Sequence, residues 1–567
     1  MKQKLGQLLR HNYFLVIVLT ILIGIAYQDL PRLFYVNDEW LQFGLVRVNG
    51  IFAGLDRFTV TDILLGKGRP LGTLINNVIF LFFPYNILPF AILSWIFHLL
   101  NSLLVFAIVK KLSRNHFISF IASIFFVSSQ ISYQSYSWVA ASVQVGGSAF
   151  FMLLAIYLYI LAIDKKIVRL EILSWASLYI SYLFKDSTVI AAVFLPLLSF
   201  FVRPRTSIKD WSRIYWWLWL GLAAFGLYRM LMLLDIASKG LGALFSPRLI
   251  PQYAIYVWNI FYYPVISVAH FFIPFRFMYR AAFAFGDFLY PFFSGPQFAF
   301  NRDVVAYTMV SDILSLLLFI PISAVLFLVY SKVKEIRKPF LFALLYYVIT
   351  MIPYAIYLDH RNSGYIESRY MYVQSLAIGI FFAGAAYACV RLITKYLKNV
   401  RLSYVIVSVI VAVFVFKQAT ILQREMQASA REASDIKHVT IEVKRVFPTL
   451  PKNPIIYLDG DRSYFYYPHM KVPLQIGPGY VFFLLYYDQV GSPQLFKKDY
   501  WLWQLFVQWY EEVDGKGFGY FYDKEKLREL FKQNKNLSVD QVVGMYYDSK
   551  TERINDISPA IKQYLLQ

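Results

Sequence analysis

The chain has 567 residues, of which 58% are hydrophobic and 19% aromatic, and its formal net charge is +21. A soluble globular chain is about 45–50% apolar, so this composition excludes an ordinary soluble protein. The charge does not indicate nucleic acid, because before Ile421 there are 36 Lys and Arg against 16 Asp and Glu, and from Ile421 onward 19 against 18. The single cysteine, Cys389, excludes an intrachain disulfide and a cysteine-based metal site.

Apolar runs that can cross a hydrocarbon core about 30 Å thick recur in the first 420 residues. Basic residues gather in six clusters between these runs, and the positive-inside rule places all six in the cytoplasm. Together they predict eleven spans, near residues 12–28, 86–109, 117–136, 143–163, 170–184, 187–202, 214–234, 304–330, 340–358, 370–390 and 402–420. The clusters are Lys2/Lys4/Arg10, Lys110/Lys111/Arg114, Lys165/Lys166/Arg169, Arg203/Arg205/Lys209/Arg213, Lys332/Lys334/Arg337/Lys338 and Arg391/Lys395/Lys398/Arg401.

One further apolar run, which begins at Tyr253, is also long enough to cross the bilayer. If it crossed, the last two basic clusters would lie outside the cell, against the positive-inside rule. We therefore expect this run to lie in the membrane plane or to re-enter from the outer side.

These patterns predict an all-α polytopic membrane bundle over residues 1–420, with a cytoplasmic N-terminus and outer loops at about 29–85 and 235–303. Residues 421–567 lack long apolar runs and predict a small extracytoplasmic α/β domain. There, "NPIIYLDGD" indicates a buried strand and a turn, and "DKEKLRELFKQN" indicates a surface helix. The aromatic stretch "WLWQLFVQWY" is expected to form a helix that docks on the bilayer or joins the core.

Charged residues near the hydrocarbon are costly and mark binding sites or transport paths. Four sets of them fall on the outer side of this topology. They are Asp38 with Glu39, Lys67 with Arg69, Lys185 with Asp186, and the group His360, Arg361, Glu367, Arg369 and Tyr370.

The third set lies in an unusually short hairpin from Leu170 to Val202. At about 1.5 Å per residue, this stretch is roughly 10 Å too short for two full crossings. The turn at Lys185 and Asp186 should therefore lie below the outer surface and face protein or a water-filled cavity. A simple ion pair between the two residues is the alternative interpretation.

Acids and cations on one face suit a transfer reaction. A carboxylate can accept the proton of a hydroxyl nucleophile. Arg and Lys can bind a phosphate, and at this depth the phosphate belongs to a lipid headgroup. The four sets together predict transfer of a group from a lipid phosphate to a hydroxyl.

Several of these stretches resemble motifs of the GT-C glycosyltransferases, in particular the protein O-mannosyltransferase-like group that includes the tetratricopeptide-linked mannosyltransferases. "NDEW" resembles the acidic motif of their first outer loop, and "GRPLGTL" followed by "HLLNSLLVF" resembles their "RP…H-x-x-N" run. "LFKDSTVI" is similar to their "SKE" motif, and "ESRYMYVQS" to "ERYLYLPS". The order of the motifs matches over about residues 14–390.

The resemblance implies a polyprenyl-phosphate-linked sugar donor, eleven or more spans and an active site outside the cytoplasm. It implies that Asp38 is the catalytic base, with Glu39 second. Arg69, Lys185 and Arg369 become the ligands of the donor phosphate, supported by Asp186, Glu367, Tyr370 and His360. The chain departs from the group in lacking the repeats, in Asp186 at a Glu position and in one extra residue between Glu367 and Arg369.

The expected partners are a polyprenyl-phosphate sugar, a hydroxyl acceptor on protein, glycan or lipid, and the bilayer, with no nucleic acid. No cofactor is expected to be required and no metal site is assigned, although His360 with Glu367 is left open as a divalent-cation pair. Two other functions stay open: a polysaccharide polymerase or ligase that uses lipid-diphosphate glycans, and a non-enzymatic transporter of lipid-linked sugars.

Overall fold

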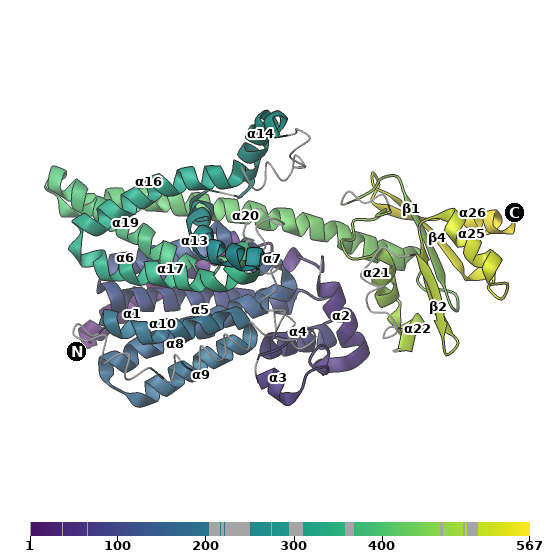
Figure 1. Cartoon of the computed structure of the whole chain (residues 1–567), viewed down its shortest axis with the longest axis horizontal. Coiled ribbons are helices and arrows are strands. Elements are labelled where there is room, and N and C mark those ends of the chain that lie inside the picture. The colour runs from purple at the N-terminus through teal and green to yellow at the C-terminus, as the bar shows by residue number, and fades with distance from the viewer. Residues whose placement is uncertain are drawn as a thin grey trace.

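The computed structural model describes residues 2–36, 38–64, 66–202, 216, 220, 250–273, 275–293, 310–357, 368–464, 469–491, 494–495 and 508–567. Most of these residues are helical, and the long helices lie side by side in one bundle (Figure 1). The bundle comprises α1 (Lys2–Ala26), α5 (Leu88–Ser113), α6 (His116–Ser128), α8 (Val139–Lys165), α9 (Val168–Phe184), α10 (Ala191–Val202), α16 (Ser311–Lys332), α17 (Arg337–Tyr357), α19 (Ser375–Leu397) and α20 (Val400–Val446).

Seven helices in the described part are long and apolar enough to cross a membrane, or eight if the bent pair α6 and α7 (Tyr133–Ser137) counts as one span. Each predicted span within the described residues coincides with a helix of the bundle, and the span predicted at 214–234 lies largely outside them. The helices α9 and α10 are short, as the length of their hairpin predicted.

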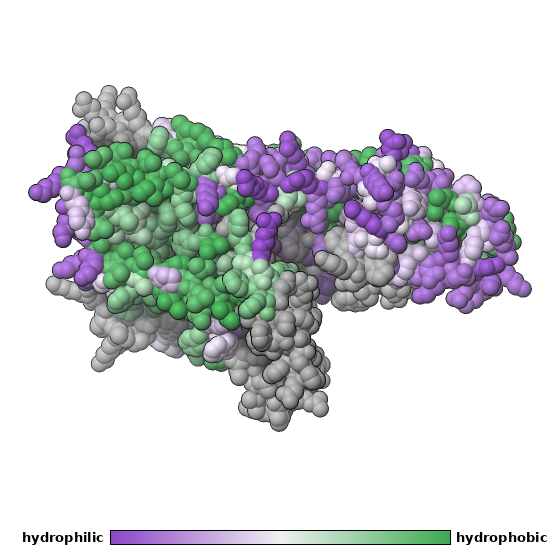
Figure 2. All heavy atoms as spheres, turned by 90° about the horizontal axis from the view of Figure 1, so that it is seen from above, coloured by the Kyte–Doolittle hydropathy of each residue, from purple (hydrophilic) through white to green (hydrophobic). Residues whose placement is uncertain are grey.

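An apolar belt on the surface of the bundle identifies the part that contacts lipid. In Figure 2 a green band of hydrophobic residues lies between hydrophilic residues at one end and a long hydrophilic region at the other. Helix α16 contributes strongly, because Leu317, Ile320 and Phe327 are each more than half exposed. Large apolar side chains left on a surface in this way need hydrocarbon as their solvent.

The basic clusters within the described residues meet at one end of this belt. Lys111 at the end of α5 pairs with Asp164 near the end of α8 at 2.9 Å. Arg391 in α19 pairs with Glu335 before α17 at 2.5 Å. The N-terminus lies at this end in Figure 1, and the C-terminal sheet lies beyond the other end. The cluster around Arg203 falls outside the described residues.

The apolar run from Tyr253 forms α13 (Ile250–Phe272), which Figure 1 shows foreshortened while α16 and α20 lie along the picture. The hydroxyl of Tyr347, near the middle of α17, donates to the carbonyl of Pro264 at 2.9 Å. The Tyr347 ring also lies 6.3 Å from the ring of Phe271. One residue of α17 therefore contacts two turns of α13. The amphipathic helix α14 (Phe275–Phe293) follows it and stands away from the bundle.

The first outer loop folds into a helical layer at the end of the bundle opposite the basic clusters. It contains η1 (Leu30–Arg32), α2 (Asp38–Asn49), η2 (Gly50–Phe52), α3 (Val60–Leu64) and α4 (Pro70–Phe82). Trp40 of α2 is 1% exposed, and its ring packs edge-on against Tyr35 and near Phe43. Burial of such aromatic side chains fixes α2 on the layer.

A small α/β domain follows the bundle, as the sequence predicts. Its five-stranded sheet has the order β2-β3-β1-β4-β5, with β1 (Ile455–Gly460) parallel to both β3 (Lys516–Phe521) and β4 (Val542–Asp548). Ile456 pairs with Tyr520 on one side and Val543 on the other. The edge strands β2 (Trp509–Val513) and β5 (Arg553–Asp556) are antiparallel to their neighbours.

Three local predictions can be compared with this domain. The strand at "NPIIYLDGD" is β1, and "DKEKLRELFKQN" contains the surface helix α25 (Lys524–Gln533). The turn after β1 is held because Asp461 accepts hydrogen bonds from Ser549, so this acid has a structural role. The helix predicted for "WLWQLFVQWY" was wrong at its end, because Trp509 and Tyr510 pair as part of β2, and residues 501–507 lie outside the described chain.

The domain contacts the rest of the protein in two places. Helix α20 continues unbroken from the bundle into it. Helix α21 (Pro478–Leu485) packs on α2, where the Tyr480 hydroxyl donates to the Leu41 carbonyl at 3.2 Å. A Cβ added to Gly44 of α2 would lie 2.0 Å from that hydroxyl oxygen, so the two helices approach closely only because residue 44 has no side chain.

We expect the C-terminal domain to be extracytoplasmic, because the basic clusters gather at the opposite end of the belt. In a Cys389→Ser background, Ser538→Cys in the sheet domain should react with a membrane-impermeant thiol reagent in intact cells. Lys334→Cys at the basic end should stay protected until the cells are opened. Labelling of Lys334→Cys together with protection of Ser538→Cys would reverse this topology.

Candidate functional site

The short hairpin places Lys185 in a buried site at the end of the bundle opposite the basic clusters. Helix α9 ends at Phe184, Lys185 is extended, and η4 (Asp186–Ile190) follows. The residue is only 7% exposed. Its ammonium nitrogen lies 5.8 Å from the centre of the Tyr354 ring and 5.3 Å from that of Tyr370. The electron-rich faces of these two rings stabilise a cation that has lost most of its water.

Arg69 reaches the hairpin from the first outer loop. Gly66 and Gly68 both have positive φ angles, and a Cβ at Gly68 would lie 2.7 Å from the Phe58 ring, so this turn requires glycine. Arg69 itself adopts the left-handed conformation at φ 50° just before α4, a strained geometry for a residue with a side chain. Such strain persists where the surrounding structure holds the residue in place.

The Arg69 guanidinium joins two other parts of the site. Its Nη1 donates to Oε1 of Gln144 in α8 at 3.1 Å. Its Nε lies 3.8 Å from a carboxylate oxygen of Asp186, whose side chain is 16% exposed. The sequence left open a simple pair between Asp186 and the adjacent Lys185. The structure gives Asp186 a distant cation as partner, which connects the first loop to the hairpin.

Arg369 enters the same site from η8 (Ser368–Tyr370). Its guanidinium carbon lies 3.8 Å from the centre of the Trp138 ring and 5.0 Å from that of Tyr370. Stacking on Trp138 fixes the plane of the guanidinium, which leaves the direction of its N–H groups defined. Arg369 and Lys185 line one small cavity together with Tyr354.

Asp38 begins α2 and is exposed. Partial burial raises the pKa of Asp38 above its ordinary value, and the nearby positive charge of Arg369 opposes this rise. The carboxylate therefore lies within electrostatic range of Arg369. Its position at a helix N-terminus also favours negative charge.

Glu39 is the neighbouring acid but lies in a different environment. It is 2% exposed, and its Oε1 accepts a hydrogen bond from the backbone N–H of Ala140 at 3.1 Å. Ala140 lies in the first turn of α8, where backbone N–H groups have no partner within the helix. Glu39 thus caps α8 from another part of the chain, whereas Asp38 is exposed.

A buried hydrogen-bond network supports the segment that carries Arg369. The Tyr136 hydroxyl donates to the Tyr372 hydroxyl at 2.7 Å, and Asn101 also donates to Tyr372 at 3.1 Å. His98 lies 2.9 Å from the same hydroxyl through Nδ1 and 3.1 Å from the Val127 carbonyl through Nε2. A carbonyl can only accept, so Nε2 carries the proton and Nδ1 accepts from Tyr372. The "H-x-x-N" residues therefore hold the residue three positions after Arg369.

The structure brings most of the predicted site residues together. Contacts run from Arg69 through Asp186 and Lys185 to Tyr370 and Arg369, and the electrostatic interaction with Asp38 completes the set. His360 and Glu367 lie outside the described residues. Sequence reasoning missed three contributors, Trp138, Gln144 and Tyr354. All three are polar or aromatic residues near the predicted outer ends of apolar runs. This location is the feature of the sequence by which they could have been found.

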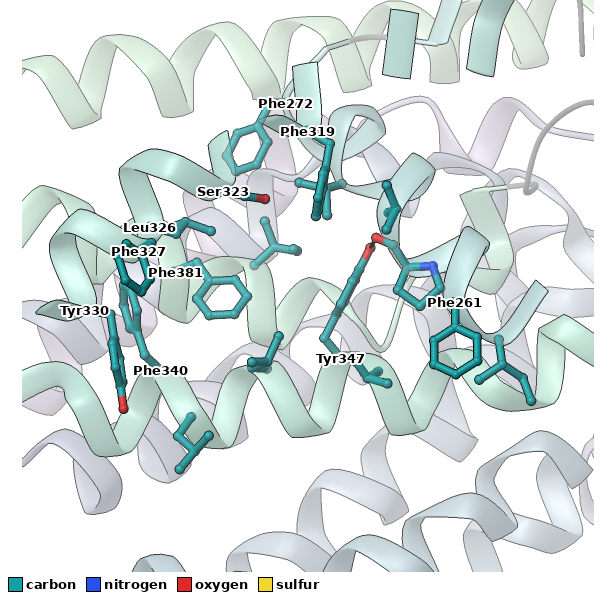
Figure 3. A pocket seen from close by; sticks show the side chains of 18 residues that line it. Phe261, Phe272, Phe319, Ser323, Leu326, Phe327, Tyr330, Phe340, Tyr347 and Phe381 are labelled. Carbon is teal, nitrogen blue, oxygen red and sulfur yellow. Dashed lines mark hydrogen bonds between the residues drawn. The ribbon is translucent and has the colours of Figure 1, made fainter. Parts of the chain in front are cut away.

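Below the site, toward the basic end, the bundle contains an apolar groove of about 570 Å³ between α13, α16, α17 and α19. Figure 3 shows the rings of Phe319, Phe327, Phe340, Tyr347 and Phe381 around it, with Ser323 as a small polar exception. Helix α17 connects the two regions, since it supplies Tyr354 to the site and Tyr347 to the groove. Hydrocarbon is the ligand that such a lining accepts.

Comparisons with known proteins find similarity at the level of structure. No family model matches the chain, and no curated protein matches it. The chain is similar to the crystal structure of ArnT from Cupriavidus metallidurans bound to undecaprenyl phosphate, with 14% sequence identity and a TM-score of 0.32. The match covers 88% of this chain and 97% of that chain. Function must be inferred from the side chains of the outer site.

Substitutions of Glu39 and Asp38 should have different effects on the stability of the protein. Glu39→Ala removes the cap of α8, which should lower the free energy of unfolding by about 1 kcal/mol and reduce the melting temperature of the purified protein. Asp38→Ala, the matched change at the adjacent exposed position, should leave the melting temperature within error. An equal loss in both variants would show that Glu39 has no special structural role.

Proposed function

We propose that this protein is an inverting membrane glycosyltransferase that moves a sugar from a polyprenyl-monophosphate donor to an acceptor hydroxyl on the extracytoplasmic face. One observation carries the proposal: Asp38, an exposed carboxylate, interacts electrostatically with Arg369, and Arg369 lines one small cavity together with the buried Lys185. Together they provide a base and an anion site at the depth of a lipid headgroup.

The two cations would bind the donor phosphate. The Arg369 guanidinium is oriented by Trp138, and a planar fork of this kind can donate two parallel hydrogen bonds to a phosphate. Lys185 adds a point charge from a buried position. A phosphate beside this small cavity would interact with both positive charges. Arg69, already paired with Asp186, would orient the hairpin and contribute long-range charge.

The lipid chain of the donor would follow α17 into the apolar groove. Thr350 and Tyr354 line the cavity, and Tyr347 and Phe340 line the groove, at spacings that place all four near one face of the helix. A chain that starts at the phosphate can therefore descend along this face into hydrocarbon-lined space. A soluble nucleotide sugar would leave the groove without a function.

Asp38 would act as the general base. It takes the acceptor hydroxyl proton while the acceptor oxygen forms a bond to the anomeric carbon of the sugar. The bond from that carbon to the phosphate oxygen breaks, and its electron pair leaves with the phosphate, which Arg369 and Lys185 hold. Attack opposite the leaving group inverts the anomeric centre without a covalent sugar–enzyme intermediate. The raised pKa of Asp38 makes it a stronger base than an ordinary aspartate.

Product analysis separates this function from its two rivals. Transfer of one sugar residue per donor supports the proposal, with release of a lipid monophosphate. An elongated glycan with release of a lipid diphosphate identifies a polymerase or ligase. Movement of the intact lipid-linked sugar across a vesicle membrane, without new glycosidic bonds, identifies a transporter.

Asp38→Asn should lower turnover about 10²- to 10⁴-fold, because it keeps the shape of the side chain and removes the base. Sugar transfer from a radiolabelled polyprenyl-monophosphate donor measures this. Asp56→Asn is the matched control, since Asp56 is an exposed acid of the same loop. Near-normal turnover in Asp38→Asn would refute the assignment of the base.

Arg369→Gln should have two effects with different readouts. Loss of a charge-assisted phosphate contact should raise the donor KM roughly 10- to 150-fold. Because Arg369 lowers the pKa of Asp38, its removal should also move the acid limb of the kcat profile to higher pH, where the carboxylate becomes protonated sooner.

Arg431→Gln is the control for Arg369→Gln, because it removes an exposed cation elsewhere on the outer side. It should leave both the KM and the acid limb unchanged. An acid limb that stays in place or moves to lower pH in Arg369→Gln would contradict the pairing of Asp38 with Arg369.

A further inference from the structure

A second site lies at the opposite end of the protein from the proposed reaction. Between α1, α5, α8, α10 and the start of α17 there is a crevice of about 1020 Å³ at the basic end of the belt. Ligand pockets typically measure roughly 300–1,000 Å³, so this crevice is large enough for a substantial ligand. It shares no lining residue with the cavity around Lys185 and Arg369.

The rim of the crevice is positively charged. Five exposed cations from two basic clusters far apart in the sequence line it: Lys110, Lys111, Arg114, Lys334 and Lys338. Each of its two acids is paired with a cation. Asp164 pairs with Lys111 at 2.9 Å, and Glu335 pairs with Arg391 at 2.5 Å. The described rim therefore presents a net positive surface to a ligand.

The wall below this rim is apolar. Leu15 and Val16 of α1 face Leu103, Phe106 and Ala107 of α5 across the crevice, with further side chains from α8 and α10. Helix α1 exposes Phe14 and Ile17, at 61% and 56%, on the neighbouring face. The crevice therefore borders the surface that contacts lipid, and a hydrocarbon chain can enter it from the bilayer.

We propose that this crevice is a binding site for an anionic phospholipid of the leaflet at the basic end. The phosphate lies among Lys110, Arg114 and Lys338, and the first part of an acyl chain lies between α1 and α5. Basic pockets between membrane helices bind anionic headgroups in this way, each cation contributing about 1 kcal/mol near a membrane surface. Topology alone requires cations at this end, but it does not require an apolar slot beneath them.

A matched pair of triple variants tests the charge component. Lys110→Gln/Arg114→Gln/Lys338→Gln removes three cations from the crevice. Lys395→Gln/Lys398→Gln/Arg401→Gln removes three exposed cations from the α19–α20 connection at the same end. Each set contains one residue with left-handed backbone at a helix end, Arg114 or Lys398. Any strain from placing glutamine in that conformation is therefore present in both triple variants.

Binding of phosphatidylglycerol to the full-length protein is followed by native mass spectrometry, with phosphatidylcholine as the neutral comparison. We expect affinity for phosphatidylglycerol to fall about 5-fold per cation in the crevice triple, on the order of 100-fold in total. The control triple should stay within a few-fold of the parent. Equal weakening in both triples, or no preference for phosphatidylglycerol over phosphatidylcholine, would overturn the proposal.

Ala107→Trp tests the apolar component without a change of charge. A tryptophan at this position fills the slot, so phosphatidylglycerol binding should fall at least tenfold while the rim is intact. Glycerol 3-phosphate, which has the charge but no chains, should not displace the bound lipid. Unchanged binding in Ala107→Trp, or displacement by glycerol 3-phosphate, would show a surface anion site and refute a lipid site.

Discussion

The outer site depends on the requirement that a buried cation in a membrane protein has compensating groups around it. Lys185 is 7% exposed at a hairpin too short to reach the surface, so its charge must be stabilised locally. Tyr354 and Tyr370 supply ring faces, and Asp186 beside it carries a negative charge that also pairs with Arg69. These compensating groups come from three distant parts of the chain, so stabilising one buried charge connects the first loop, the hairpin and the segment after α17.

Hydrophobicity and charge predicted the bundle well, because the bilayer permits few solutions. A helix satisfies its own backbone polar groups, so a long apolar run in lipid has one stable form, and basic residues mark one side. The short α9–α10 hairpin was predictable for the same reason. The sheet domain was predicted in outline only. The aromatic residues Trp509 and Tyr510 favour a membrane helix and an edge strand equally by composition, and pairing with β3 decided between them.

The candidate site was predictable where charge at membrane depth gave a signal, as for Asp38, Lys185 and Arg369. It was not predictable where neutral side chains position the charged ones. Trp138 and Gln144 contact Arg369 and Arg69 only after α8 is packed beside α5 and α4, which no local pattern reveals. The different environments of Asp38 and Glu39 were not predictable either, because two adjacent acids look equivalent in the sequence. Only the structure shows that Glu39 accepts a hydrogen bond from the Ala140 N–H.

The length of the unbroken helix α20 determines how far the sheet domain lies from the hydrocarbon. With no interruption between Val400 and Val446, the residues that follow Ile421 raise the sheet roughly 40 Å above the hydrocarbon. The hydrogen bond from Tyr480 to Leu41, one helical turn from Gly44, connects the domain to α2 in addition to its connection through α20. The sheet domain is therefore held at a distance from the lipid by α20 and is joined through α21 to the same helix α2 that Asp38 begins.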